Sequence, residues 1–139
     1  MPGCHSKSHH RGSWDIYRIV ISDIPPSNNK YMGRGSIKGQ AFAYQAEKQR
    51  WAWLIKAAAK NRPRKPLQKA IVRIKYYFPD GRRRDPDNYS GKFILDGLRL
   101  AGIVEDDSFT NIRLELEGYV DKSNPRTVVE LEEIPCERS

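Results

Sequence analysis

Apolar and polar side chains alternate along three stretches of the sequence, a pattern typical of β-strands with one buried face, and a fourth stretch predicts a strand by its β-branched content. The clearest stretch is 70–78, where Ala, Val, Ile, Tyr and Phe occupy every second position. Residues 16–21 are rich in β-branched side chains, and residues 112–116 and 127–131 alternate in the same way. We therefore expect four strands, with a solvent face on the last two formed by Glu115, Glu117, Glu130, Glu132 and Glu133.

Two segments between these strands predict helices. Residues 40–60 are rich in alanine and contain neither Gly nor Pro. One apolar face of this helix is expected to carry Phe42, Ala46, Trp53 and Ala57. Trp51 and Trp53 are two positions apart, so they cannot both centre on the core. One of them is expected at the surface, against DNA or a second subunit, or half-buried with its polar edge in water.

The second predicted helix runs from about residue 89 to Ala101, with Gly102 as its C-terminal cap. Together these elements predict a small α/β (α+β) domain with one mixed sheet and two main helices. A chain of 139 residues has the length of one domain. We place that domain at residues 15–134, between polar tails at 1–14 and 135–139.

Composition limits the class of protein. No apolar run approaches the roughly 20 residues needed to span a bilayer, and the N-terminus lacks the apolar core of a secretory signal. The cytoplasm is the expected location. Two cysteines near opposite ends of the chain do not indicate a disulfide framework. A tail cluster could chelate a transition metal, although no second cluster completes a zinc site: Cys4, His5, His9 and His10.

Charge is distributed unevenly along the chain. Residues 1–93 hold 20 Lys and Arg against six Asp and Glu, a net charge of +14. Residues 94–139 hold five against 11, a net charge of −6. A basic region of this size favours an anionic partner, with nucleic acid ahead of a membrane surface, because no helix pairs a Lys-rich face with a clean apolar one.

Two aspartates follow the arginine run in the second half of the chain. Asp85 and Asp87 flank Pro86, which favours extended backbone before it and would direct both carboxylates to one side. Carboxylates this close repel one another unless a cation lies between them, and Mg²⁺ prefers oxygen ligands. A nearby helix N-terminus would favour phosphate. This pattern predicts metal-assisted phosphodiester hydrolysis.

Further candidates follow on the predicted second helix and after it. Lys92 and Asp96 are four residues apart, so Lys92 either pairs with Asp96 or reaches the phosphate. The adjacent pair Asp106 and Asp107 either completes the metal site or serves as turn residues.

DNA contacts are expected from two basic segments. The first is a loop after the first strand, in which glycines accompany basic and aromatic residues. These residues can follow a phosphate backbone and stack on a base. The alternative is a solvated connection whose charge has no such role. Its candidates are Asn29, Lys30, Tyr31, Arg34 and Lys38. The second segment supplies Arg82, Arg83, Arg84 and Asn88.

The combination of these motifs resembles the RusA family of Holliday junction resolvases. The matching residues are Asp85-x-Asp87-Asn88, Lys92, Asp96-x-Leu98, Gly102 and Asp106-Asp107, with Pro25-Pro26-Ser27-x-Asn29-x-Tyr31 in an earlier loop. The resemblance covers roughly residues 16–133. It implies a small α/β fold, a homodimer and Mg²⁺-dependent cutting of four-way DNA junctions in recombination and repair, with Mn²⁺ as a substitute. Such enzymes are typical of phages and of bacteria with prophages.

The resemblance also implies roles for individual residues. Asp85, Asp87 and Asp107 correspond to the family's catalytic carboxylates, with Asp106 as a neighbouring ligand, and Lys92 corresponds to its essential lysine. This chain has one residue more than the family pattern at Ser90-Gly91, where a glycine can absorb it.

Two other functions remain open on the residues alone. The chain could be a non-enzymatic nucleic-acid-binding module whose aspartates pair with the neighbouring arginines. It could also be a nuclease of similar mechanism that acts on other branched DNA. Dependence on divalent metal separates the module from the two enzymes.

Overall fold

The fold is a four-stranded sheet with two helices, in a computed structural model that describes residues 16–28 and 37–135. The predicted α+β class is confirmed. The elements follow one another as β1 (Ile16–Ile21), α1 (Ile37–Ala58), β2 (Ala70–Phe78), α2 (Lys92–Leu100), β3 (Ile112–Val120) and β4 (Arg126–Glu133).

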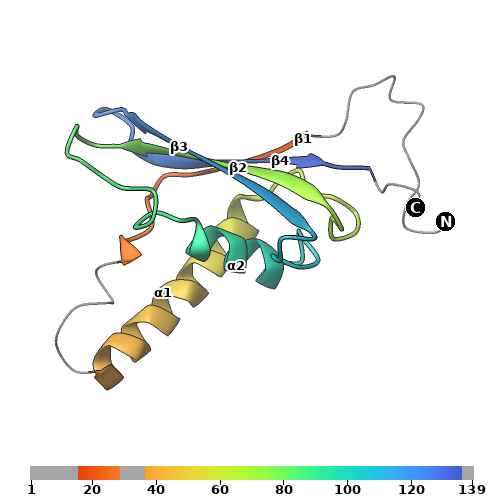
Figure 1. The fold of residues 1–139 in the computed structure, drawn as a ribbon, viewed down its shortest axis with the longest axis horizontal. Coiled ribbons are helices and arrows are strands. Elements are labelled where there is room, and N and C mark those ends of the chain that lie inside the picture. The colour runs from red at the N-terminus through yellow and green to blue at the C-terminus, as the bar shows by residue number, and fades with distance from the viewer. Residues whose placement is uncertain (1–15, 29–36, 136–139) are drawn as a thin grey trace.

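The sheet has the strand order β1-β4-β2-β3, and it is mixed. β2 pairs with β3 in parallel and with β4 antiparallel, while β1 pairs with β4 antiparallel. Parallel neighbours need a crossover connection, and α2 provides it between β2 and β3. Both helices cover the same face of the sheet (Figure 1).

The buried face of the sheet follows the predicted alternation. In β2, every second residue from Ala70 to Phe78 is buried, and the residues between them are half-buried. The opposite face carries charged pairs across strands: Arg73 contacts Glu115 and Glu132, each at 3.0 Å, and Lys75 contacts Glu130 at 3.3 Å. The predicted solvent face is therefore confirmed for Glu115, Glu130 and Glu132, but Glu133 pairs with the buried Ala70 and lies on the opposite face.

The predicted apolar face of α1 is wrong. Phe42 is 79% exposed and Trp53 is 68% exposed, whereas Trp51 and Ile55 are fully buried. Trp51 does not keep its polar edge in water, and its indole Nε1 has no hydrogen-bond partner among the described residues. The burial instead follows the contact with α2, where Gly97 lies against Ile55 and Trp51. Packing against a neighbouring helix decided which of two apolar faces faces inward.

Helix α2 begins at Lys92, not at residue 89 as predicted. Gly91 precedes it with φ of 88°, in the left-handed region that favours glycine. The predicted cap at Gly102 is confirmed: its N–H donates to the Arg99 carbonyl, and the Ile103 N–H donates to the Leu98 carbonyl. These two bonds are those of a Schellman motif.

Some expectations concern residues outside the described part of the chain. They include the tail residues 1–14 and 136–139, among them Cys4, His5, His9, His10 and Cys136. Among the residues that are described, no helix is both long and apolar enough to cross a membrane.

Replacement of Gly91 by alanine should destabilise the fold by at least about 2 kcal/mol, through left-handed strain and overpacking. A Cβ at this position would lie 2.7 Å from Ile74 Cδ1. Gly102→Ala should cost less, because φ is 75° there but no atom lies within 4 Å of the added carbon. Urea denaturation measures both, with exposed Gly81→Ala as the control. Equal losses for Gly91→Ala and Gly102→Ala would contradict this packing.

Candidate functional site

The loop that joins β2 to α2 carries the candidate aspartates, and Arg84 braces it from within. Arg84 Nη1 donates to the carbonyl oxygens of Asp80 at 2.7 Å and Arg82 at 3.1 Å. Its other terminal nitrogen lies 2.9 Å from Asp80 Oδ1, and its guanidinium lies 4.3 Å from the centre of the Phe78 ring. Only 14% of the Arg84 side chain is exposed. Arg84 therefore holds the loop closed, and its donors are directed into the protein.

Asp80 is the acceptor at the start of this loop. Its carboxylate accepts from the backbone N–H of Arg82 and contacts the Arg82 and Arg84 guanidinium groups. The pKa of Asp80 is lowered, first by the Arg82 backbone N–H and then by the Arg82 side chain. A charge at Asp80 is thus part of the folded loop.

A second support comes from Asn28, at the end of the segment after β1. Its backbone N–H donates to the Asn88 carbonyl at 2.8 Å, and its Nδ2 donates to the Asp87 carbonyl at 2.9 Å and to Ser90 Oγ at 3.1 Å. The sequence prediction missed Asn28. The available signal was an amide side chain close to Pro25-Pro26. These bonds attach the proline-rich segment to the aspartate loop.

Asp85 and Asp87 lie in a turn and not in the extended backbone that was expected. The Asn88 N–H donates to the Asp85 carbonyl at 3.0 Å, with Pro86 at the second position, which proline favours in such turns. The Asp85 carboxylate accepts from Arg83 Nε at 3.2 Å, and 47% of the Asp85 side chain is exposed. Asp87 is exposed. Both carboxylates thus sit in one short turn with access to solvent.

Asp106 and Asp107 lie at the other end of the sheet. α2 runs back along the sheet (Figure 1), and after it Val104 bridges to Leu67, just before β2 begins. The Glu105 N–H donates to the Leu67 carbonyl at 2.9 Å. The aspartate loop instead follows the far end of β2, a strand that spans roughly 26 Å for its nine residues. One chain therefore does not bring the two acidic segments together.

The chemistry of these groups suits a divalent cation in part. Paired carboxylates in a turn are suitable oxygen ligands. Within residues 16–28 and 37–135, however, no three His, Cys, Asp or Glu side chains lie close enough to hold a metal ion. The turn of a single chain supplies two carboxylates. Asp106 and Asp107 could act as further ligands only if another turn of this kind lay beside them.

Lys92 does not pair with Asp96. Asp96 is nearly buried and contacts Lys48 Nζ of α1 at 3.3 Å. The ammonium of Lys92 lies 5.8 Å from the centre of the Tyr44 ring, and Lys92 is exposed at the start of α2. No carboxylate among the described residues contacts it, so its charge faces solvent beside the aspartate loop.

The predicted DNA contacts divide into three groups. Arg82 and Arg83 extend into solvent, with 80% and 86% of their side chains exposed. Arg84 and Asn88 serve the loop itself, through the bonds described above. The remaining candidates lie outside the described residues, apart from the backbone of Lys38 in the first turn of α1: Asn29, Lys30, Tyr31, Arg34 and Lys38.

An acidic turn flanked by exposed arginines combines carboxylates that can hold a divalent cation with positive charges that attract a phosphodiester backbone. The family model described as Endodeoxyribonuclease RusA matches residues 23–132. That span includes the loop, Lys92 and both acidic segments and covers most of the chain, so the protein belongs to the RusA endodeoxyribonuclease family. A comparison with curated proteins finds no match.

Removal of the internal brace should destabilise the protein more than removal of an exposed neighbour. Arg84→Ala loses two hydrogen bonds to carbonyl oxygens and the contact with Phe78, and we expect a loss of roughly 1–2 kcal/mol in the free energy of unfolding. Arg83→Ala, the matched control, should change it by less than about 0.5 kcal/mol. Urea denaturation of both variants measures the difference. Equal values would show that Arg84 does not hold the loop.

The charge of Asp80 should appear in the pH dependence of stability. Because the folded-state pKa is lowered, the stabilisation is present above the ordinary pKa of about 3.9 and is lost as the pH falls through the folded value. Asp80→Asn should therefore lower stability at neutral pH and weaken its decline in acid. Melting temperatures between pH 7 and pH 3 measure this. A decline as steep as that of the wild type would contradict it.

Proposed function

We propose that this protein is a metal-dependent endonuclease that cuts four-way DNA junctions, and that the loop between β2 and α2 carries its active site. The observation that supports this most is the match to the RusA endodeoxyribonuclease family across the fold and both acidic segments. Branched DNA is the substrate, and resolution of recombination and repair intermediates in the cytoplasm is the role.

Asp85 and Asp87 are the proposed metal ligands in the loop. A divalent cation there, Mg²⁺ or Mn²⁺ in its place, would supply positive charge at the scissile phosphate and lower the pKa of water. Lys92 would offset negative charge on the same phosphate, since its ammonium is exposed beside the loop. Asn28 and Arg84 would keep the turn in one shape while DNA binds.

A second copy of the chain is proposed to complete the site. Asp106 and Asp107 follow the bridge beside the start of β2, whereas Asp85 and Asp87 follow its end, which supports a site shared between two chains. In a two-fold dimer a contact made by one chain is repeated by the other. If Asp107, with Asp106 beside it, meets the partner's loop, the dimer gains two equivalent sites. Two sites suit paired cuts in opposed strands of a junction.

The DNA is proposed to approach the loop end of the sheet. Arg82 and Arg83 are exposed there, and the basic segment of Asn29, Lys30, Tyr31, Arg34 and Lys38 is expected to add contacts. The outer face of the sheet is a poor alternative, because Arg73 and Lys75 are paired there with glutamates. Arg82 and Arg83 also contact aspartates, each at 3.2 Å, but 80% and 86% of their side chains are exposed, so phosphates can reach them. Only 26% of Arg73 and 25% of Lys75 are exposed.

A binding module is the second candidate, favoured by one contact. Arg83 Nε lies 3.2 Å from Asp85 Oδ1, so the aspartate could serve as a structural partner of the arginine. Both side chains are about half or more exposed, and an ion pair of this kind contributes little. Such a module would bind DNA equally well with EDTA and would never nick it.

Cleavage of a synthetic four-way junction should depend on both turn aspartates. Asp85→Asn and Asp87→Asn should each lower the rate by roughly 100-fold or more with Mg²⁺, because each removes a charged ligand, while junction binding is retained. Linear duplex is the substrate control, and Glu115→Gln on the outer face of the sheet is the protein control. Wild-type cleavage by either aspartate variant, or tight binding without cutting in Mg²⁺ and Mn²⁺, would refute the assignment.

A further inference from the structure

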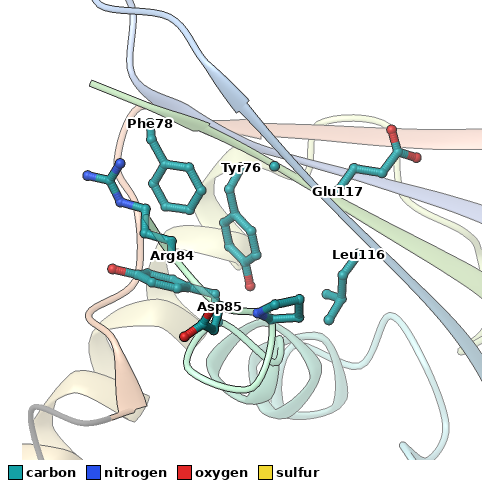
Figure 2. A pocket seen from close by; sticks show the side chains of 9 residues that line it. Tyr76, Phe78, Arg84, Asp85, Leu116 and Glu117 are labelled. Atoms are coloured by element: carbon teal, nitrogen blue, oxygen red, sulfur yellow. The ribbon is translucent and has the colours of Figure 1, made fainter. Parts of the chain in front are cut away.

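A pocket lies between the sheet and the aspartate loop, directly beside Asp85. Figure 2 shows Tyr76 and Phe78 projecting from the sheet towards the loop, with Arg84 and Asp85 at the pocket's edge and the Glu117 carboxylate directed away. Its empty space is about 340 Å³, including the part open to solvent. The lining residues used below are Tyr76, Phe78, Arg84, Asp85, Tyr89 and Gly118.

Three aromatic rings form the pocket's walls and hold one another in place. The Tyr89 ring meets Phe78 edge-on at 5.1 Å and Tyr76 at 5.7 Å between centres. Tyr76 and Phe78 are 5.7 Å apart with planes inclined by 30°. Tyr76 is 3% exposed and Phe78 is 7% exposed, so neither can swing away. The pocket thus offers small exposed parts of two fixed rings together with the half-buried Tyr89 ring, and aromatic rings attract one another edge to face as well as stacked.

Positive charge lies next to this aromatic surface. A second hollow, of about 410 Å³, shares Phe78, Arg84 and Gly118 with the pocket and is also lined by Arg82. The exposed Arg82 side chain therefore lies beside the pocket, and the exposed Arg83, which follows it in the sequence, contacts the Asp85 carboxylate at the pocket's edge. An aromatic hollow flanked by arginines and a carboxylate turn combines a surface for a base with charges for its backbone.

The pocket is open because residue 118 has no side chain. Gly118 is the β3 partner of Tyr76 in the parallel ladder. A Cβ added to it would lie 3.4 Å from Phe78 Cε2, so it would just touch the aromatic wall. Its φ is not in the left-handed region, and larger residues can therefore adopt its backbone. A larger side chain there would fill the space from the floor.

We infer that this pocket receives one unstacked base of the DNA strand whose phosphate lies at the aspartate turn. The inference rests on the proposed function for the identity of the ligand. Asp85 forms part of the rim, so a base in the pocket would place its own or the adjacent phosphate beside the turn. A base costs less to unstack where its pairing or stacking is already weakened, and a branch point interrupts the stacking of the bases that flank it. The pocket would then select branched DNA over duplex.

The test combines a filled pocket with a missing base. Gly118→Val suits a strand and fills the pocket, and four-way junctions carry an abasic site at each branch-flanking nucleotide in turn. Binding is titrated with EDTA present, so the result does not depend on cleavage. For the wild type, one abasic position should weaken binding by roughly 5- to 150-fold, the range expected for one stacked base. Gly118→Val should bind the intact junction as weakly as the wild type binds the junction with that abasic site. The abasic site should weaken binding by Gly118→Val no further.

Two controls make the outcome decisive. Tyr89→Leu removes one wall without filling the floor, and it replaces Gly118→Val if that variant melts early; Lys122→Ala, an exposed residue outside the pocket, should match the wild type. The inference fails if a folded pocket variant binds the intact junction with wild-type affinity. It also fails if the losses of affinity caused by the substitution and by the abasic site add. It also fails if Gly118→Val abolishes self-association, since a second chain would then occupy the pocket. Absence of cleavage by the wild type would count against the proposed function alone.

Discussion

The parallel pairing of β2 with β3 is the constraint on which the rest of this structure depends. Parallel neighbours cannot be joined by a tight turn, so the chain must return along the full length of the sheet before β3 begins. The loop after β2, α2 and the segment after α2 make that return together, since nine helical residues span only about 13 Å. The aspartate turn is consequently fixed where β2 ends, and Asp106 and Asp107 are fixed where β3 begins. An active site that uses both must combine ends of the fold that one chain keeps apart.

The loop at the end of β2 shows how like residues acquire different tasks. Three consecutive arginines follow Asp80, and Arg84 alone turns inward to bond the loop's carbonyl oxygens. Its two neighbours remain exposed. Asn28 ties the opposite side of the loop to the segment after β1. A turn supported from both sides can present two carboxylates in a defined arrangement, which a metal site requires and a flexible acidic loop does not provide.

Much of the sheet was predictable from the sequence because its signal is local. The alternation in β2 reports directly on its buried face, and Gly102 ends α2 through a motif that needs glycine. The inward face of α1 was not predictable, since Phe42 and Trp53 are as apolar as Trp51 and only the contact with α2 distinguishes them.

The same distinction holds for the candidate site. Asp85 and Asp87 are close in sequence and remain close in the turn, although Pro86 induces a turn where extended backbone was expected. Asp96 and Lys92 are one helical turn apart, yet Asp96 pairs with Lys48 from α1. Lys48 is 48 positions before Asp96 in the sequence, so no local pattern indicates the pairing. Residues that meet only through packing, including any contributed by a second chain, leave no periodic signal.

Complementation between two inactive variants tests the central claim most directly. Asp85→Asn and Asp107→Asn proteins are mixed, allowed to exchange chains, and assayed on a four-way junction with Mg²⁺. If each site combines the turn of one chain with Asp107 of the other, a mixed dimer holds one intact site and should nick one strand of the junction, although neither variant alone cuts. If both segments act within one chain, every site in the mixture is defective. Continued absence of nicking, with chain exchange demonstrated, would contradict the account.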